Sequence, residues 1–346
     1  MSRLSLDQIA PMLACDLRDL PPAEQERIWS NPDFIAEEKF NGVRGLLHIG
    51  KKENRISTRC LSKRTGLYSE KTDHFQHLRN LPLDFLDGTV IDGEILMNKS
   101  RMFTGETFAC GTLSCTMALC NASPEKAFVL QQEEGHASFQ AFDILRYKGE
   151  SLENQPFWRR RQVLEKLFSD TAAKGIELTS LNLATQVSDD KRDFYEAVLS
   201  SGGEGVMLKH RDALYQHVGR SKGMLKAKRF LTVDGFIIGA TSGKNGNTGM
   251  IGSLLIGVYD LCTDRVREIA GVPPSDLSLG KNSNLRRAMT VLKDGKPCLA
   301  PGFLNGVVEL EAFQWNNWRL VHAKILRFRD DKAPQDCVVD FLGMEE

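Results

Sequence analysis

The sequence lacks any run of about 18 consecutive apolar residues, which is the length that a helix needs to cross a lipid bilayer. Its first residues, Met1 to Asp7, also lack the apolar core of a secretion signal. The eight cysteines are scattered, and none forms the C-x-x-C pair that is typical of zinc sites. We therefore expect a cytoplasmic protein with reduced thiols and no membrane contact.

An excess of charge of either sign is also missing, because 45 Lys and Arg balance 45 Asp and Glu. Nucleic-acid-binding proteins are usually basic, so this balance argues against tight, sequence-independent binding. Local basic groups remain, such as Lys226-Ala227-Lys228-Arg229. A small nucleic-acid contact would need only a few of them.

The length of 346 residues predicts two domains, with a boundary near residue 230. Before the boundary, strands alternate with helices expected at 157–174 and 190–200. After it, five short strands are separated by glycine-rich turns, and the last of them is expected at 318–328. One helix, with Leu285, Ala288, Met289 and Leu292 at helical spacing, is expected between the third and the fourth. The first pattern predicts an α+β domain with antiparallel sheets and flanking helices. The second is typical of a small closed β-barrel of the OB type.

Lys39 stands at the end of a short predicted strand, Phe34–Glu38. Asn41-Gly42 predicts a tight turn, and 43–49 predicts the returning strand of a hairpin. A lysine at a strand end, beside a glycine that lets a ligand approach the backbone, is suited to act as a nucleophile. The competing interpretation of such a lysine is an ordinary solvated charge.

Several strands carry one chemically distinctive residue each. Glu94 and Glu204 are single acids on apolar strands, and an unpaired carboxylate in a core is costly, so we expect each to face a cleft. Lys226 and Lys228 share one face of their strand, where they could bind a phosphate. Phe142 either stacks on a ligand or packs in the core.

These segments, in this order, resemble the covalent nucleotidyltransferase superfamily, and specifically the short two-domain ATP-dependent DNA ligases of bacteriophages and bacteria. The resemblance covers essentially the whole chain. It rests on six motifs. In the first half of the chain these are K-x-D-G-x-R at Lys39–Arg44, D-G-E at Asp92–Glu94 and aromatic-D-I-L at Phe142–Leu145. In the second half they are E-G-V-M-L-K at Glu204–Lys209, K-x-K at Lys226–Lys228 and R-x-R-x-D-K at Arg327–Lys332.

The resemblance implies an adenylation domain at 1–230, an OB-fold domain at 231–346, and the cofactors ATP and Mg²⁺. Lys39 would form a lysine–AMP intermediate, AMP would pass to the 5′-phosphate of nicked double-stranded DNA, and the 3′-hydroxyl would displace it. Such a protein would act as a monomer in DNA replication, repair and recombination, inside a bacterial or phage-infected cell.

The resemblance also assigns residues to the nucleotide and the nick. Glu37 would contact the adenine amino group, Phe142 and Met207 would enclose the base, and Arg59 and Arg220 would bind ribose or nick phosphates. Glu94 and Glu204 would bind ribose hydroxyls and Mg²⁺. Arg329 and Lys332, with Asp331, would serve only the first step. The full nucleotide-binding set is Glu37, Glu38, Lys39, Arg44, Arg59, Glu94, Phe142, Met207, Arg220, Lys226, Lys228, Arg329 and Lys332.

One position departs from the family pattern, because Asn41 stands where the family has aspartate. The loss of a carboxylate near Lys39 should lower the pKa of its amine.

Three other functions remain open from the sequence. An RNA-capping guanylyltransferase shares the lysine and a similar C-terminal motif, but the segments 142–145 and 215–228 look more like a ligase. An RNA ligase is less favoured because of the expected OB-fold domain. A non-catalytic DNA-binding protein is disfavoured by the retained charged motif residues. An NAD-dependent ligase would need zinc-finger cysteines, which the sequence lacks.

Overall fold

The computed structural model describes residues 11–58, 69–97, 112–217, 219–244, 247–274, 283–316 and 318–341. The chain divides into two compact units, of which the N-terminal unit ends at Lys228 and the C-terminal unit begins at Arg229. Arg59, which the sequence assigned to a ligand contact, lies outside the described residues. The predicted α+β class is confirmed.

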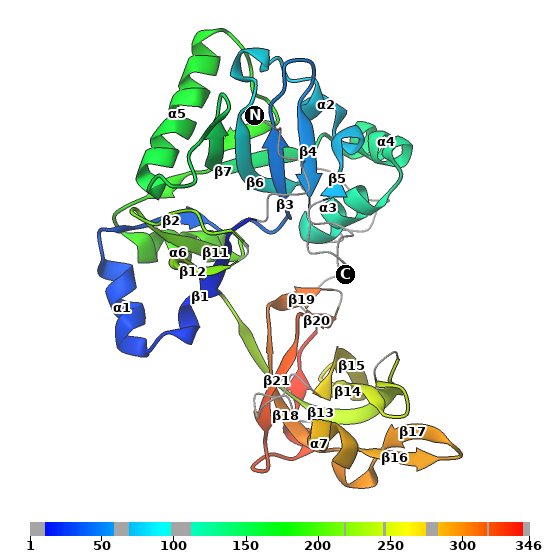
Figure 1. Cartoon of the computed structure of the whole chain (residues 1–346). Coiled ribbons are helices and arrows are strands. Elements are labelled where there is room, and N and C mark those ends of the chain that lie inside the picture. Colours follow the sequence, from blue (N-terminus) through cyan, green and yellow to red (C-terminus); the bar gives the residue numbers. More distant parts are fainter. Residues whose placement is uncertain are drawn as a thin grey trace. The chain divides into compact units, whose positions relative to one another are not determined.

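The N-terminal unit is built on two sheets (Figure 1). The five-stranded sheet has the order β1 (Leu13–Asp16), β12 (Arg220–Lys228), β11 (Gly205–His210), β2 (Phe34–Glu38) and β10 (Gln186–Val187). The second sheet has the order β5 (Ser69–Glu70), β4 (Arg55–Thr58), β3 (Val43–His48), β6 (Val90–Leu96), β7 (Ser138–Tyr147) and β8 (Glu150–Ser151), with β9 (Leu181–Leu183) also paired to β7. Within these sheets, β1–β12 and β7–β9 are parallel pairs and the other described pairs are antiparallel.

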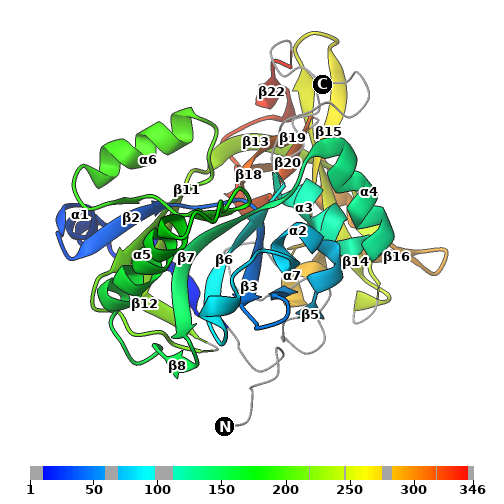
Figure 2. The same cartoon turned by 90° about the horizontal axis from the view of Figure 1, so that it is seen from above.

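Helices cover these sheets. They are α1 (Pro22–Ser30), α2 (Gln76–Arg79), α3 (Thr112–Asn121), α4 (Pro124–Glu134), α5 (Phe157–Ala173) and α6 (Lys191–Ser200), with short 3-10 helices at Leu17–Asp19, Thr72–His74 and Asp84–Leu86. Leu164 and Leu167 of α5 are fully buried in the core that this helix forms with β7. Helix α6 packs on β2 and β11 (Figure 2). The helices expected at 157–174 and 190–200 are therefore confirmed as α5 and α6.

The predicted hairpin around Lys39 is wrong. Strand β2 pairs with β10 and β11, whereas β3 pairs with β4 and β6, so the chain passes from one sheet to the other between them. A Cβ atom on Gly42 would lie 2.1 Å from the carbonyl oxygen of Ile95 on β6. Gly42 is therefore required because the backbone of β6 approaches closely at this crossing, and not because of a tight hairpin turn.

The C-terminal unit contains a six-stranded sheet. Its strands are β15 (Arg265–Val272), β14 (Ile251–Asp260), β13 (Leu231–Ser242), β18 (Val307–Ala312) and β21 (Lys324–Phe328), with β22 (Val338–Val339) paired to β14. Two hairpins stand apart from it, β16 (Thr290–Lys293) with β17 (Lys296–Leu299), and β19 (Gln314–Asn316) with β20 (Arg319–Val321). Helix α7 (Ser283–Ala288) precedes β16, and 3-10 helices lie at Pro301–Phe303 and Pro334–Asp336.

The closed barrel expected from the sequence is not formed among the described strands of this unit. The predicted last strand, 318–328, is divided between β20 and β21, which belong to different sheets. The predicted helix is also shorter, since Leu292 lies in β16 with 67% of its surface exposed. Local apolar spacing did not reveal that the segments around 290–299 and 314–321 form separate hairpins, β16–β17 and β19–β20. Because these strands do not join the six-stranded sheet, β15 and β21 remain at its two edges.

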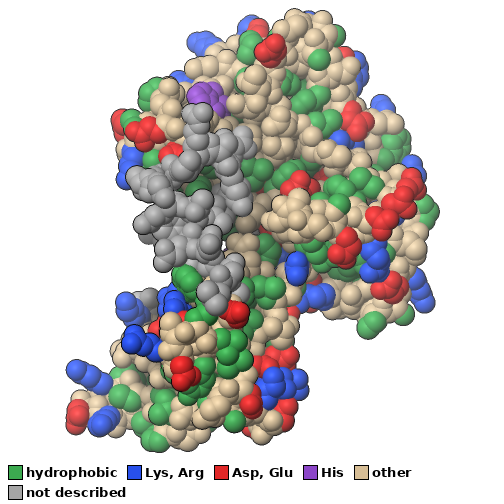
Figure 3. Space-filling model, turned by 180° about the vertical axis from the view of Figure 1, so that it is seen from behind, with side chains coloured by type: hydrophobic (Ala, Val, Ile, Leu, Met, Phe, Trp, Pro, Cys, Tyr) green, Lys and Arg blue, Asp and Glu red, His purple; other side chains and the backbone are tan. Residues whose placement is uncertain are grey.

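In the described part of the chain, no helix is both long and apolar enough to cross a membrane. On the face that Figure 3 shows, lysine and arginine side chains are interspersed with aspartate and glutamate. This mixture matches the balanced composition, and the charges that matter for function are therefore local groups.

Candidate active site

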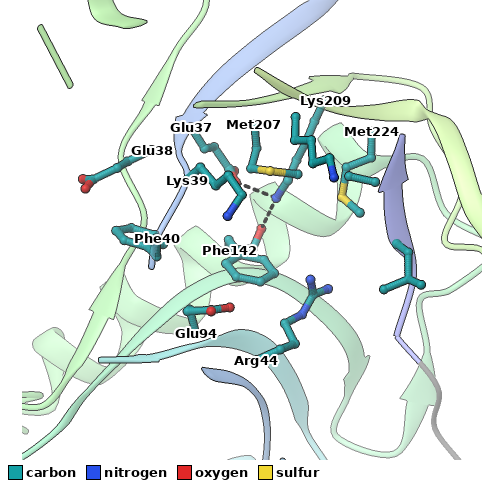
Figure 4. A pocket seen from close by; sticks show the side chains of 13 residues that line it. Glu37, Glu38, Lys39, Phe40, Arg44, Glu94, Phe142, Met207, Lys209 and Met224 are labelled. Carbon is teal, nitrogen blue, oxygen red and sulfur yellow. Dashed lines mark hydrogen bonds and ion pairs between the residues drawn. The ribbon is translucent and has the colours of Figure 1, made fainter. Parts of the chain in front are cut away.

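A pocket of about 170 Å³ lies in the N-terminal unit (Figure 4). It is formed by both sheets and by the segment that crosses between them. Its lining consists of Leu13, Ala14, Glu37, Glu38, Lys39, Phe40, Arg44, Glu94, Phe142, Met207, Lys209, Met224 and Lys226. The crossing segment therefore brings Lys39 to the place where the two sheets meet.

The Lys39 side chain is held between charged groups. Its Nζ lies 2.5 Å from Oε2 of Glu204, and Nζ of Lys228 pairs with Oε1 of the same carboxylate. Burial lowers the pKa of Lys39, and the nearby Lys228 cation lowers it further, although Glu204 opposes both effects. A buried lysine with a lowered pKa is closer to the neutral amine that acts as a nucleophile.

Glu37 is almost completely buried, with 1% of its surface exposed. Its Oε2 lies 2.5 Å from Nζ of Lys209, and its Oε1 accepts a hydrogen bond of 2.7 Å from Nε2 of Gln186. Nη1 of Arg161 lies 3.7 Å from the same Oε1. These partners fix the Glu37 carboxylate at the pocket wall, because a buried carboxylate without them would be strongly destabilising.

Arg44 is positioned by a buried aspartate. Its Nε and Nη2 donate hydrogen bonds of 2.5 and 2.6 Å to the two oxygens of Asp92, which also accepts a bond of 2.6 Å from the Tyr215 hydroxyl. The guanidinium of Arg44 lies 4.6 Å from the centre of the Phe142 ring, and Nζ of Lys209 lies at the same distance. The exposed part of Phe142 therefore belongs to a cationic pocket, and not to a purely apolar core.

Glu94 contributes a second carboxylate to the pocket. Burial raises its pKa to about 7, and the Arg44 and Lys39 cations only partly offset this effect. Within the described residues, no group of three or more His, Cys, Asp or Glu side chains is arranged to hold a metal ion. Glu94 and Glu204 nevertheless offer the oxygen ligands that Mg²⁺ prefers, and this ion is commonly held by one or two carboxylates together with substrate phosphates and waters.

The two strand lysines and Arg220 occupy different positions around the pocket. Lys226 lines it and lies 3.8 Å from Asp16 Oδ2, whereas Lys228 contacts Glu204. Both lysines project from the same face of β12, as alternation along the strand requires. Arg220 lies at the start of β12, does not line the pocket, and donates a bond of 2.7 Å to the carbonyl of Ala14.

The structure thus brings most of the sequence-predicted residues of the N-terminal unit together. Those that line the pocket are Glu37, Glu38, Lys39, Arg44, Glu94, Phe142, Met207 and Lys226. Glu204 lies beside the pocket in contact with Lys39, and Lys228 in turn contacts Glu204. Arg329 and Lys332 belong to the C-terminal unit.

Sequence reasoning missed three residues that shape the site, namely Lys209, Asp92 and Tyr215. Lys209 ends the apolar run Val206-Met207-Leu208, and a charge on such a strand is costly unless it is paired. That cost was a usable indication of a buried ion pair. Tyr215 and Asp92 are 123 positions apart, and no local pattern joins them.

Comparisons with known proteins agree with this site. The family described as "ATP dependent DNA ligase domain" matches residues 11–228. The DNA ligase of Methanopyrus kandleri is 26% identical over 338 residues, which cover 95% of this chain and 57% of that protein. A probable DNA ligase of Dictyoglomus turgidum is 31% identical over 247 residues, which cover 68% of this chain and 39% of that protein. The chain therefore spans less than two thirds of the length of these relatives.

The fold is similar to that of a solved structure. A structure from the Lig E DNA ligases, described as showing DNA binding with a minimal scaffold, superposes with a TM-score of 0.58 and 20% identity. The match covers 92% of this chain and 99% of that one. At this level of identity the likeness establishes a shared fold.

Proposed function

Because the chain belongs to the ATP-dependent DNA ligase family, we propose that it seals nicks in duplex DNA through a covalent lysine–AMP intermediate. The observation that carries this proposal is the partly buried Lys39, whose amine has a lowered pKa and points into a pocket of cationic and aromatic side chains (Figure 4). The proposal includes a monomeric protein that works in the cytoplasm of a bacterial or phage-infected cell.

In the first step, the neutral amine of Lys39 attacks the α-phosphorus of ATP. The new N–P bond forms as the bond to the leaving pyrophosphate breaks, and the amine loses a proton. Oε2 of Glu204, 2.5 Å from Nζ, is positioned to accept that proton. Lys226 and Lys228 neutralise the phosphate charge, which is what phosphoryl transfer chiefly requires from a protein.

The adenine ring of ATP would occupy the part of the pocket lined by Phe142 and Met207. Stacking between an aromatic ring and an apolar side chain fits a purine. Recognition of the adenine amino group by Glu37 is supported by the position of its carboxylate at the pocket wall. Its pairing with Lys209 and Gln186 keeps the carboxylate oriented before ATP arrives.

In the second step, an oxygen of the 5′-phosphate at the nick attacks the phosphorus of the lysine–AMP, and Lys39 takes back the proton held by Glu204 and leaves as the amine. In the third, the 3′-hydroxyl gives its proton to solvent as its oxygen attacks the adenylated 5′-phosphate, the bond to AMP breaks, and the strand is continuous. We assign Arg220 to a nick phosphate, because its exposed side chain lies beside Ala14 at the edge of the pocket. Arg59 stays a predicted ligand of ribose or of the nick.

Glu94 and Glu204 are the residues that we expect to hold Mg²⁺. When bound, the ion supplies neutralisation of the phosphate charges. Each carboxylate is already near a cation, so the arriving phosphates would redistribute existing ion pairs around the pocket.

The test is transfer of radiolabel from α-labelled ATP to the protein, followed by sealing of a nicked duplex. We expect Lys39→Ala to abolish covalent labelling, since no other nucleophile is assigned. Lys39→Arg should fail as well, because arginine stays protonated at working pH. Labelling of Lys39→Ala at the normal rate would disprove the assignment, and labelling by GTP in preference to ATP would favour a guanylyltransferase.

A further inference from the structure

Asp234 on β13 binds two of the three cations of the C-terminal motif, Arg329 and Lys332, while Arg327 pairs with Glu309. The Asp234 carboxylate pairs with Nζ of Lys332, and Nη1 of Arg329 donates to its oxygens at 3.2 and 3.4 Å. Only 17% of the Asp234 side chain is exposed, and 15% of Arg329. Asp234 is paired with Glu309 of β18, and β13 also pairs with β14 from Phe236 onward, so the sheet restrains the position of Asp234.

A second carboxylate completes the charge balance. Asp331 accepts two hydrogen bonds of 2.8 Å from Nε and Nη2 of Arg329, but 66% of its side chain is exposed. Two cations thus face two carboxylates, and the group has no net charge. Asp331 holds Arg329 in a bidentate pair from an exposed position within the motif, whereas Asp234 belongs to a sheet strand and contacts both Arg329 and Lys332.

We propose that Asp234 is a positioning residue that holds Arg329 and Lys332 in a neutralised state and competes for them with a polyphosphate, either inorganic pyrophosphate or the β- and γ-phosphates of ATP. The inference rests on the proposed function and on the role in its first step, the step that releases pyrophosphate, which the family resemblance implies for Arg329 and Lys332. It adds to Asp331 of the motif a second carboxylate competitor, which lies on β13 and also binds Lys332.

The chemistry of the cluster supports an exchange of this kind. An ammonium and a guanidinium bind carboxylate and phosphate oxygens through the same donors, so a polyphosphate would take over bonds now made to Asp234. When the polyphosphate leaves, the carboxylate again neutralises both cations. The carboxylate therefore weakens polyphosphate binding and keeps the cations oriented between turnovers.

The experiment measures binding of inorganic pyrophosphate by calorimetry to the full chain carrying Lys39→Ala, in which no lysine–AMP can form. In this background, Asp234→Asn removes the competing charge. We expect the Kd for pyrophosphate to fall by about two- to fivefold, which corresponds to the usual interaction energy of a partly exposed charge pair. Asp234→Glu should leave the Kd near the original value. Adding Lys332→Ala to Asp234→Asn should remove the gain, because the two residues act through the same contact.

A matched control is available on the neighbouring strand. Glu309 is paired in register with Asp234, its side chain is 18% exposed, and it pairs with Arg327 at 2.5 Å. Glu309 also helps to raise the pKa of Arg329, so Glu309→Gln should lower the Kd for pyrophosphate by much less than Asp234→Asn does. An equal gain in Glu309→Gln would reduce the effect to general electrostatics, and an unchanged or weakened affinity in Asp234→Asn, or no measurable pyrophosphate binding, would overturn the proposal.

A kinetic readout separates this inference from the proposed function. With Lys39 present, Asp234→Asn should lower the KM for ATP in self-adenylylation and also lower the maximal rate, because tighter binding is gained at the expense of orientation. If the unmodified chain forms no lysine–AMP while the pyrophosphate results hold, the proposed reaction is wrong and the role of Asp234 as competitor stands. If lysine–AMP forms but the Asp234 variants match the unmodified chain, only the inference about Asp234 fails.

Discussion

Lys39 shows how opposing effects decide the protonation of one residue. Burial and Lys228 favour the neutral amine, whereas Glu204 favours the charged form, and the pKa of Lys39 is lowered on balance. Because several charged side chains surround Lys39, a further charge placed nearby should shift its pKa. Position 41, two residues from Lys39, is the natural place to add one.

Asn41→Asp should raise the pKa of Lys39, because a carboxylate stabilises the ammonium form. The attacking species is the neutral amine, so we expect the pH profile of self-adenylylation to move to higher pH. Asn41→Ala, which adds no charge, should leave the profile in place. The rate of lysine–AMP formation measured between pH 6 and pH 9 tests this, and a shift to lower pH in Asn41→Asp would contradict it.

Glu94→Gln should stabilise the fold increasingly as the pH rises. Burial raises the pKa of Glu94 from 4.5 to about 7, so between these values the folded protein holds a proton that the unfolded chain has lost, and stability falls as pH increases. Glutamine removes this dependence. We expect the gain in unfolding free energy to be roughly 2 kcal/mol larger at pH 8 than at pH 5.5.

Urea unfolding of both proteins at the two pH values measures the difference. Equal gains at pH 5.5 and pH 8 would show that Glu94 does not titrate between them.

At the scale of the elements, the site depends on the crossing between β2 and β3. The two strands belong to different sheets, and the segment between them places Lys39 beside β11, where its backbone N–H donates to the carbonyl of Gly205 at 2.9 Å. The crossing also places Gly42 directly on the backbone of β6. The position of Lys39 is therefore set by strand packing.

Gly42→Ala should destabilise the N-terminal unit by about 1–3 kcal/mol, the typical cost of forcing an atom into a filled space. The added Cβ would lie 2.1 Å from the Ile95 carbonyl oxygen, so β6 or the crossing must shift. Gly219→Ala is a suitable control, since within the described residues its Cβ would come no closer than 3.8 Å to a neighbouring atom, the His217 carbonyl oxygen. Unfolding by urea gives both values, and equal stability of the two variants would show that the crossing is not tightly packed.

At the scale of the whole molecule, each unit has its own core. Leu47, Ile91 and Phe139 are among the fully buried residues of the N-terminal unit, and Leu254, Val308 and Ile325 are among those of the C-terminal unit. Independent cores allow the units to act as separate bodies. A cationic element on one unit could then assist a reaction in the other and withdraw afterwards.

Lys332→Ala should slow lysine–AMP formation by about a hundredfold or more, because a donor to the leaving pyrophosphate is lost. Sealing of a nick that already carries 5′-AMP should stay near normal, since no pyrophosphate leaves in that step. Lys324→Ala is the control, because Lys324 pairs with Glu311 at 2.9 Å outside the motif. Removal of residues 231–346 should impair both steps through weaker DNA binding, and equal damage to both steps by Lys332→Ala would refute the division of labour.

The order of motifs, the α+β class, the helices α5 and α6 and the longer strands could be read from the sequence, because apolar periodicity and single charged residues on apolar strands are local properties. The same locality explains why Lys39, Glu94, Phe142 and Lys226 could be named as candidates, and all four line one pocket.

Only the tertiary structure decided which strands pair and which charges meet. It separated β2 from β3, divided the last predicted strand between two sheets, and joined Tyr215 to Asp92, and Asp234 to Lys332, across distances along the chain that no periodicity spans. The reason is that strand pairing and buried ion pairs depend on which surfaces the completed core leaves adjacent, and the free energy of a contact does not depend on the sequence separation of its partners.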